Sequence, residues 1–219
     1  MTRLTQVLVL PATVLALCVL PTPTSTAAPL VPDLGPVLVT APEVNRIVKG
    51  YGPLQNDPKQ DRNTPAYIGD GPDIPDSCRN TEDPTRAFGA GYEAFRTMTY
   101  SGPKNLGVVQ TVATYPSPES AQQVYDAYVA NLQDCVGVYP VDTLGTAPEI
   151  SLVPGVPNTA VLEGSTEQAQ AKLVQVYGDA LFWVTAQNFP EDASVVWPIA
   201  ELIQQKLDAR TTPSTESGP

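Results

Sequence analysis

The side chains that most often perform chemistry are sparse in this sequence. No histidine occurs among the 219 residues, which excludes triads of the Ser-His-Asp kind and most transition-metal sites. The Gly-x-Gly runs at 69–71 and 89–91 do not stand between a strand and a helix, so they do not predict a nucleotide-binding loop. We therefore expect a protein that is not an enzyme, with no catalytic residue and no cofactor.

Carboxylates are the remaining candidates for chemistry. Asp70, Asp73 and Asp76 recur in a loop rich in glycine and proline, and their oxygens could bind Ca²⁺. An EF-hand takes its ligands from alternate positions, however, and the prolines stiffen this loop. We favour a solvated loop and expect no metal site. A glycosidase needs two carboxylates brought together by the fold, and the sequence singles out no such pair.

The N-terminal segment is typical of a signal peptide. Residues 1–27 contain a charge at Arg3, an apolar run over residues 7–20 and small residues that end at Ala27. We expect cleavage directly after Ala27, and therefore a secreted, extracytoplasmic protein. Beyond residue 27 no stretch is long and apolar enough to predict a transmembrane helix.

The cysteines agree with export. Removal of the signal peptide takes Cys18 and leaves two of the three cysteines, the even number that an oxidising compartment favours. We expect a disulfide between Cys78 and Cys135, with two separate buried thiols as the alternative. Lipidation of Cys18 is a less favoured alternative to secretion. A lipobox places a small residue directly before the cysteine, where this chain has Leu17.

The segment between these two cysteines has the clearest order. Residues 93–101 and 106–115 are rich in β-branched and aromatic side chains and flank a turn, which predicts an antiparallel hairpin. Ser117 can then cap an amphipathic helix that ends near Cys135. The apolar stripe of that helix consists of Ala121, Val124, Tyr125, Tyr128 and Leu132.

Local motifs predict elements in the rest of the chain. Thr40 and Glu43 form a capping box at the start of a short helix, and Gly178 suits the two-residue turn of a second hairpin. Pro198 favours a C-terminal helix that begins near Ser194. In chain order we expect an extended lead-in at 28–39, a helix at 41–49, an aperiodic connection at 51–76, strands at 136–143 and 159–163, a hairpin at 171–177 and 180–187, a helix at 192–207 and a disordered tail at 209–219.

Aromatic residues are spread over both hairpins and the central helix, and most of them are expected to pack in the core. Three side chains combine apolar reach with a hydrogen-bonding tip. If a cleft lies between the sheet and the central helix, Arg96, Tyr100 and Tyr128 are the ligand-binding residues that we expect at its polar rim.

The net charge of the chain indicates which classes of binding partner are disfavoured. The formal charge of −11 repels phosphate backbones and anionic lipid headgroups, so nucleic acid and membrane surfaces are disfavoured. We expect a small ligand or a component of the cell envelope as the partner.

The order of these segments resembles a known family. The run T-A-P-E-V-N-x-I-x-x-G at 40–50, the phrase T-Y-P-S-P-E-S-A-Q-Q-V-Y at 114–125 and the cysteine that ends the helix are similar to the mycobacterial PknH-like extracellular sensor domain. The resemblance covers residues 40–208. It implies an α+β fold with an antiparallel sheet built from two hairpins, packed with a central and a C-terminal helix. It also implies a cleft for an unidentified ligand.

One departure from the family stands out. Its kinase members carry a second disulfide around the late hairpin, and this chain has no cysteine after Cys135. The late hairpin is therefore expected to be held by packing alone, through Val174, Val176, Phe182, Trp183 and Val184.

Two functions are compatible with these observations. We favour a free-standing secreted domain, without a kinase, that binds a ligand in the manner of a sensor. The alternative is a secreted cell-envelope module for protein–protein interaction without a small ligand, using the 51–76 connection or a sheet edge. A deep pocket with a few convergent polar groups would favour the first, and a flat exposed apolar patch the second.

Overall fold

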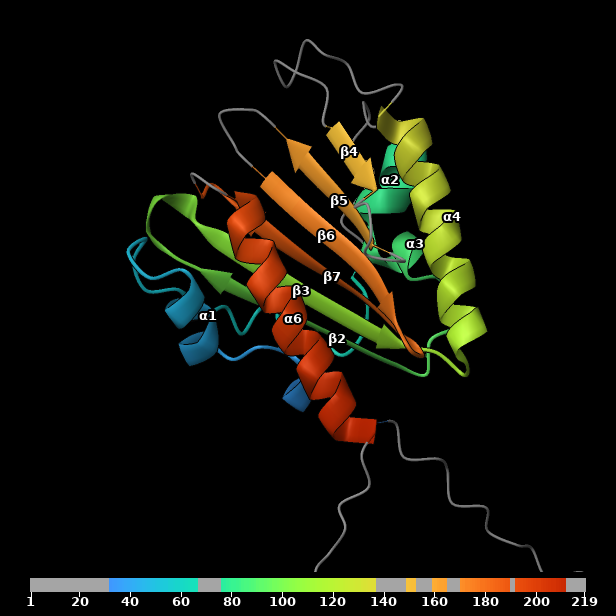
Figure 1. The fold of residues 1–219 in the computed structure, drawn as a ribbon, viewed down its shortest axis with the longest axis horizontal. Coiled ribbons are helices and arrows are strands. Elements are labelled where there is room, and N and C mark those ends of the chain that lie inside the picture. Colours follow the sequence, from blue (N-terminus) through green and yellow to red (C-terminus); the bar gives the residue numbers. More distant parts are fainter. Residues whose placement is uncertain are drawn as a thin grey trace, which may run out of the picture. The chain divides into compact units, whose positions relative to one another are not determined.

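An antiparallel sheet organises the part of the chain that the structure, a computed structural model, describes: residues 32–66, 76–136, 149–152, 159–164, 170–189 and 192–211. Within these ranges seven strands lie in the order β1-β2-β3-β7-β6-β5-β4, and helices pack on both faces of the sheet (Figure 1). The expected α+β class is confirmed. The expected signal peptide at 1–27, residues 137–143 of an expected strand and residues 212–219 of the expected tail lie outside the described residues.

The two expected hairpins are confirmed and form the centre of the sheet. β2 (Ala94–Ser101) pairs with β3 (Gly107–Thr114), and β6 (Gln170–Tyr177) pairs with β7 (Ala180–Gln187). Strands β3 and β7 pair with each other along their whole length, which joins the hairpins into one surface. Gly178 turns the second hairpin with a φ of 59°, a left-handed conformation that glycine adopts without a steric penalty.

Shorter strands complete the two edges of the sheet. β1 (Gln55–Asn56) pairs with β2 at one edge, while β5 (Thr159–Gly164) and β4 (Glu149–Leu152) follow β6 at the other. β5 confirms the strand expected at 159–163. β4 was not expected, because its four residues are too short to show a periodic pattern between proline-rich stretches.

One face of the sheet is covered by η1 (Gly35–Val37), α1 (Ala41–Ile47) and α6 (Asp192–Thr211), and we call it the α6 face (Figure 1). The predicted capping box is confirmed, since Thr40 and Glu43 bond reciprocally at the start of α1. The apolar stripe of α6 is buried against β6 and β7 and consists of Val195, Val196, Ile199, Ala200, Ile203 and Leu207.

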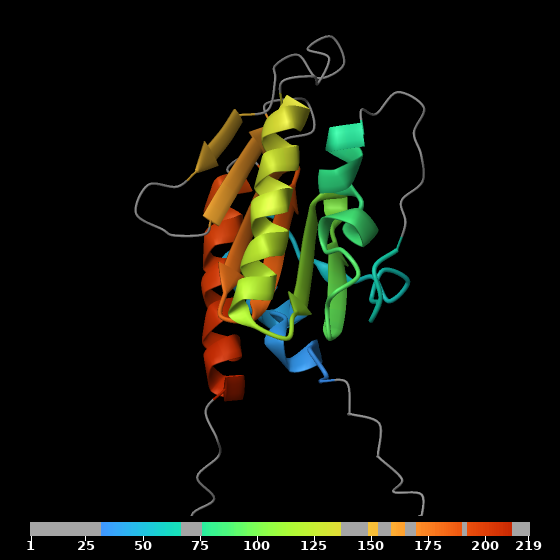
Figure 2. The same cartoon turned by 90° about the vertical axis from the view of Figure 1, so that its right-hand side faces the viewer.

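The other face carries α4 (Pro118–Val136), α2 (Asp76–Glu82) and α3 (Pro84–Ala87), and we call it the α4 face. Figure 2 shows α2 and α3 beside α4. The expected disulfide between Cys78 and Cys135 is confirmed, and it ties α2 to the last turn of α4. α2 and α3 were not expected, because their short sequences lack an apolar stripe. Val136, expected to begin a strand, instead ends α4.

The late hairpin is held by packing on both of its faces. The five side chains that were expected to hold it are all buried. Three of them, Val174, Val176 and Trp183, face α4, whereas Phe182 and Val184 face α6.

Residues 32–39 of the expected lead-in are more structured than predicted, and residues 28–31 lie outside the described residues. Residues 35–37 form the 3₁₀ turn η1, and Val37, Leu38 and Val39 are buried in the core of the α6 face. Their burial removes apolar surface from water, which explains why this stretch packs instead of extending into solvent.

The C-terminal helix begins at Asp192, as in the expected range 192–207, and not near Ser194 as Pro198 suggested, so Pro198 lies inside it. It is longer than predicted at its C-terminal end, where it reaches Thr211, within the expected tail. An internal proline costs roughly 3 kcal/mol. Burial of the five larger apolar side chains of this stripe on the sheet, at about 1.5–3 kcal/mol each, outweighs that cost.

Candidate functional site

A cleft of about 610 Å³ opens on the α4 face of the sheet. α4 packs on β6 and β7 and leaves the cleft side of β2 and β3 without a helix of that length over it. The described residues that line the cleft come from the sheet, from α3 and from the chain after β1; they are Asp57, Gln60, Arg62, Ala66, Pro84, Phe95, Thr97, Thr99, Ser101, Val109, Thr111, Lys172, Trp183, Thr185 and Gln187.

Half of the sheet residues that form the floor of this cleft carry a hydroxyl side chain. Successive residues of a strand point to opposite faces, so alternate positions of β2 share the floor. Cross-strand pairing then aligns them with hydroxyls of the neighbouring strands, because Thr97 lies opposite Thr111 and Thr99 opposite Val109, which in turn lies opposite Thr185. We call these side chains the hydroxyl floor: Thr97, Thr99, Ser101, Thr111 and Thr185.

One wall of the cleft is the chain that follows β1. The Asp57 N–H donates to the Thr99 carbonyl at 2.8 Å, and Arg62 forms an isolated bridge with Thr97. Between these contacts the chain bulges away from β2. Asp61 closes the bulge, since its carboxylate lies 2.6 Å from the guanidinium of Arg96 on β2. The wall is therefore fastened to the sheet at both ends.

The inner end of the cleft is built around Lys172. Its side chain is buried, and its ammonium donates to the Thr81 carbonyl of α2 at 2.9 Å. The same ammonium lies 4.0 Å from the ring centre of Trp183 and 5.5 Å from that of Tyr128, which stabilises the charge through cation–π contacts. Because the disulfide at Cys78 holds α2 in place, it also positions the carbonyl that orients Lys172.

The three ligand-binding residues expected from the sequence are not brought together. Tyr100 faces the α6 side, where its hydroxyl donates to the Val39 carbonyl at 2.8 Å. Burial first, and then the carboxylates of Asp61 and Glu43, raise the pKa of Tyr100 to about 12, so the hydroxyl keeps its proton at physiological pH.

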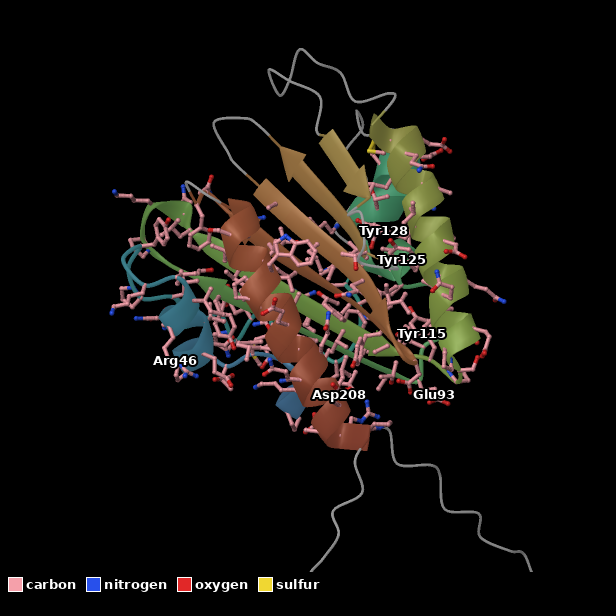
Figure 3. The ribbon with its side chains drawn as sticks, viewed as in Figure 1. Arg46, Glu93, Tyr115, Tyr125, Tyr128 and Asp208 are labelled. Atoms are coloured by element: carbon pink, nitrogen blue, oxygen red, sulfur yellow. A yellow bond between two sulfur atoms is a disulfide. The ribbon has the colours of Figure 1, made fainter. Side chains whose placement is uncertain are left out.

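Tyr128 points from α4 toward the sheet and is buried (Figure 3). Arg96 is engaged by Asp61 and Asn63. None of Arg96, Tyr100 and Tyr128 is among the described residues that line the cleft. The polar side chains that line the cleft include instead the hydroxyl floor, Arg62 and Lys172.

The hydroxyl floor was missed by the sequence reasoning, although a signal existed. Positions 97, 99 and 101 carry hydroxyls at every second residue of a predicted strand, which is the period of one sheet face. Threonine is also a β-branched strand former, so the same residues predict a strand without indicating a cleft. A polar set with period two on a central strand indicates a face that no helix fully covers.

Two further expectations concern metals and membranes. The described part of the chain contains no group of three acidic, cysteine or histidine side chains that could hold a metal ion. Asp70 and Asp73 of the weighed calcium site lie outside it. In the same described ranges, no helix is both long and apolar enough to span a membrane.

Comparisons with known proteins complete the description of the site. The crystal structure of the extracellular domain of PknH from Mycobacterium tuberculosis matches with a TM-score of 0.57 and 17% sequence identity, over 79% of this chain and 93% of that one. That likeness shows a shared fold. No curated protein matches the chain. The family model of the PknH-like extracellular domain matches residues 31–186, which is more than half of the sequence. The chain therefore belongs to the family of PknH-like extracellular domains.

Proposed function

We propose that this protein is a secreted, sensor-like domain that binds a small ligand in the cleft of the α4 face and performs no chemistry on it. The observation that carries the proposal is the hydroxyl floor. Its side chains lie on the inner strands of a sheet, where an apolar face covered by a helix is the usual arrangement. A cleft of about 610 Å³ is within the range of small-molecule sites.

The polar groups of the cleft suit binding better than catalysis. Threonine and serine hydroxyls are weak nucleophiles unless a base activates them, and the sequence has no histidine. The ammonium of Lys172 is held by a carbonyl and two rings. The carboxylate of Asp57 accepts from the N–H of Lys59 in its own loop at 3.0 Å. Groups fixed in this way favour recognition of a ligand.

Two features support an extracytoplasmic setting. The family is one of extracellular domains, and the disulfide between Cys78 and Cys135 is of the kind that persists in oxidising compartments. The segment at 1–27 supplies an export signal in this proposal, with cleavage after Ala27.

A thermal-unfolding screen of the exported protein tests this function. The screen uses neutral, cationic and anionic small molecules, each at a single high concentration. A ligand at about 100 times its Kd stabilises a protein by about 2.7 kcal/mol, which corresponds to a rise in Tm of roughly 5 °C or more for a domain of this size.

A variant that fills the cleft locates the binding. Thr99→Phe places an aromatic ring on the hydroxyl floor, and Gln133→Phe adds the same ring at an exposed position of α4. We expect the ligand-induced shift to disappear in Thr99→Phe and to persist in Gln133→Phe. An equal shift in both variants would place the ligand elsewhere. If no compound of any class produces a shift, the protein–protein interaction module becomes the better account.

A further inference from the structure

The charges of the cleft differ from those of the whole chain. The formal net charge is −11, yet the charged residues among the described lining are Arg62, Lys172 and a single acid, Asp57. Lys172 and Asp57 are engaged by other parts of the protein, as described above. The site is therefore locally more positive than its surroundings, which concentrates small anions.

Arg62 is the cation that is available to a ligand. Its side chain is exposed and forms no hydrogen bond or ion pair with any residue in the described ranges. Its backbone is nevertheless fixed, because it forms a bridge with Thr97. Residues opposite each other in an antiparallel pair point to the same face, so the guanidinium stands over the hydroxyl floor. Its rigid fork of N–H donors matches a carboxylate.

Several hydroxyls of the floor are also available. Thr97 is occupied, since its hydroxyl bonds to that of Thr111 at 2.9 Å and to the Gln110 carbonyl at 3.1 Å. In contrast, the hydroxyls of Thr99, Ser101 and Thr185 make no hydrogen bond to any described residue. Thr185 is buried and Thr99 half-buried, so their hydroxyls favour a partner. Ser101 is exposed, and each of the three hydroxyls can both donate and accept. A ligand rich in hydroxyls satisfies such groups, whereas an alkyl chain does not.

The spacing of these groups sets the size of the ligand. Arg62 and Thr185 lie on chain segments separated by three strand-to-strand steps, which is roughly 14 Å at the usual strand spacing. A sugar of one or two rings with its acid group fits that span, in keeping with the volume of about 610 Å³.

We infer that the cleft binds a small sugar acid, in which a carboxylate pairs with Arg62 and the sugar hydroxyls bond to Thr99, Ser101 and Thr185. The inference rests on the ligand-binding function proposed above. A carboxylate is favoured over a phosphate because its single charge is repelled less by the acidic protein and because one arginine fork satisfies it. The same long-range repulsion disfavours polyanions such as nucleic acids.

The test compares sugar acids with their neutral counterparts on the full exported chain. The probes are glucuronate with glucose, galacturonate with galactose, and lactobionate with lactitol, and octanoate and glucose 6-phosphate are added as an apolar acid and a phosphate. We expect at least one sugar acid to stabilise the protein more than its neutral partner, octanoate or the phosphate. Its affinity should fall as salt is raised, because added ions screen the pairing with Arg62.

Two arginine variants test whether the carboxylate of the ligand pairs with Arg62. Arg62→Gln should weaken the sugar acid by about 10-fold or more, since a charge-assisted bidentate pair is lost, and should leave any neutral sugar unaffected. The control Arg46→Gln removes the same charge from an exposed position of α1, on the α6 face (Figure 3), and should not change the affinity. Unchanged affinity in Arg62→Gln would overturn the inference.

The outcomes separate this inference from the proposed function. If a neutral sugar, a phosphate, a cation or octanoate binds best and Thr99→Phe abolishes that binding, the sugar-acid inference fails while the ligand-binding function stands. If no compound of any class binds in the cleft, both fail. Binding of a sugar acid that survives Thr99→Phe would also overturn the inference, because the ligand would then lie outside the cleft.

Discussion

The two faces of the sheet treat their polar groups differently. On the α6 face, Gln110 is fully buried, and its side-chain amide accepts from the Val39 N–H at 2.8 Å and donates to the Val39 carbonyl at 2.9 Å. On the α4 face, Thr99 and Thr185 have hydroxyls without such partners among the described residues. A covered face favours pairing of its polar groups within the protein, although the buried hydroxyl of Thr114 on that face makes no hydrogen bond to a described residue. On the partly covered face, the function proposed above assigns the unpaired hydroxyls to a ligand.

The disulfide should give the largest effect, because it fastens the helices of the partly covered face. Replacing both Cys78 and Cys135 with serine reopens a loop with a sequence separation of 57 residues. In the chain-entropy treatment this costs about 4 kcal/mol. Denaturant unfolding with and without reductant measures the change. Reductant should destabilise the wild type by a similar amount and leave the double variant unchanged; a wild type indifferent to reductant would contradict the prediction.

A matched pair of polar-to-apolar changes then compares the faces directly. Gln110→Leu leaves the N–H of Val39 without a partner in the core, while the Val39 carbonyl keeps the hydrogen bond from Tyr100, so we expect a loss of about 1–3 kcal/mol. Thr99→Val removes a hydroxyl that has no partner in the described ranges, and stability should change by less than about 0.5 kcal/mol. Chemical denaturation of both variants is the measurement. Equal losses would mean that the two faces do not differ in this respect.

The smallest of the three effects concerns the polar contact between α1 and α6 on the α6 face. Glu43 accepts from the Thr40 N–H at 2.7 Å and from the ammonium of Lys206 on α6 at 2.9 Å. Burial acts to raise the pKa of Glu43, but the hydrogen bonds from Thr40 and Lys206 outweigh it and lower the pKa from 4.5 to about 2. We expect Glu43→Gln to cost about 2 kcal/mol near neutral pH.

The pH dependence of that loss has a definite sign. Because the folded protein holds the pKa of Glu43 below its unfolded value, the stabilisation is complete above pH 4.5 and is lost as the pH falls toward 2. The stability difference between wild type and Glu43→Gln should therefore shrink over that window. The control Glu201→Gln changes an exposed carboxylate on α6 and should show no such trend. A difference that stays constant with pH would argue against this role of Glu43.

Elements with a strong local signal could be predicted from the sequence. The capping box at Thr40, both hairpins and the stripe of α4 depend on residues that lie close together in the chain, and all were found. The short elements α2, α3 and β4 have no such pattern. The disulfide holds α2 and pairing with β5 holds β4, whereas α3 begins at a cap in which Asp83 accepts from the Thr85 N–H.

The site could be predicted only in part, because it depends on which side chains of β2 lie on the α4 face of the sheet. Tyr100 and Thr99 are neighbours, so they point to opposite faces, and a sequence alone does not say which face is covered. Tyr100 has the expected hydrogen-bonding hydroxyl, but this hydroxyl donates to the Val39 carbonyl in the core. The cleft itself results from the position of α4 over β6 and β7. That position depends on packing between residues far apart in the sequence, which local patterns do not predict.

The edge of the sheet at β1 has a consequence for solubility at high concentration. An exposed, straight edge strand offers its free backbone groups to another molecule and promotes aggregation. Here β1 is two residues long, and the chain then bulges through Pro58 and Lys59 before it returns to β2 at Arg62. A proline without an N–H and a charged lysine both oppose strand addition. The wall of the cleft thus also protects the protein from edge-to-edge polymerisation.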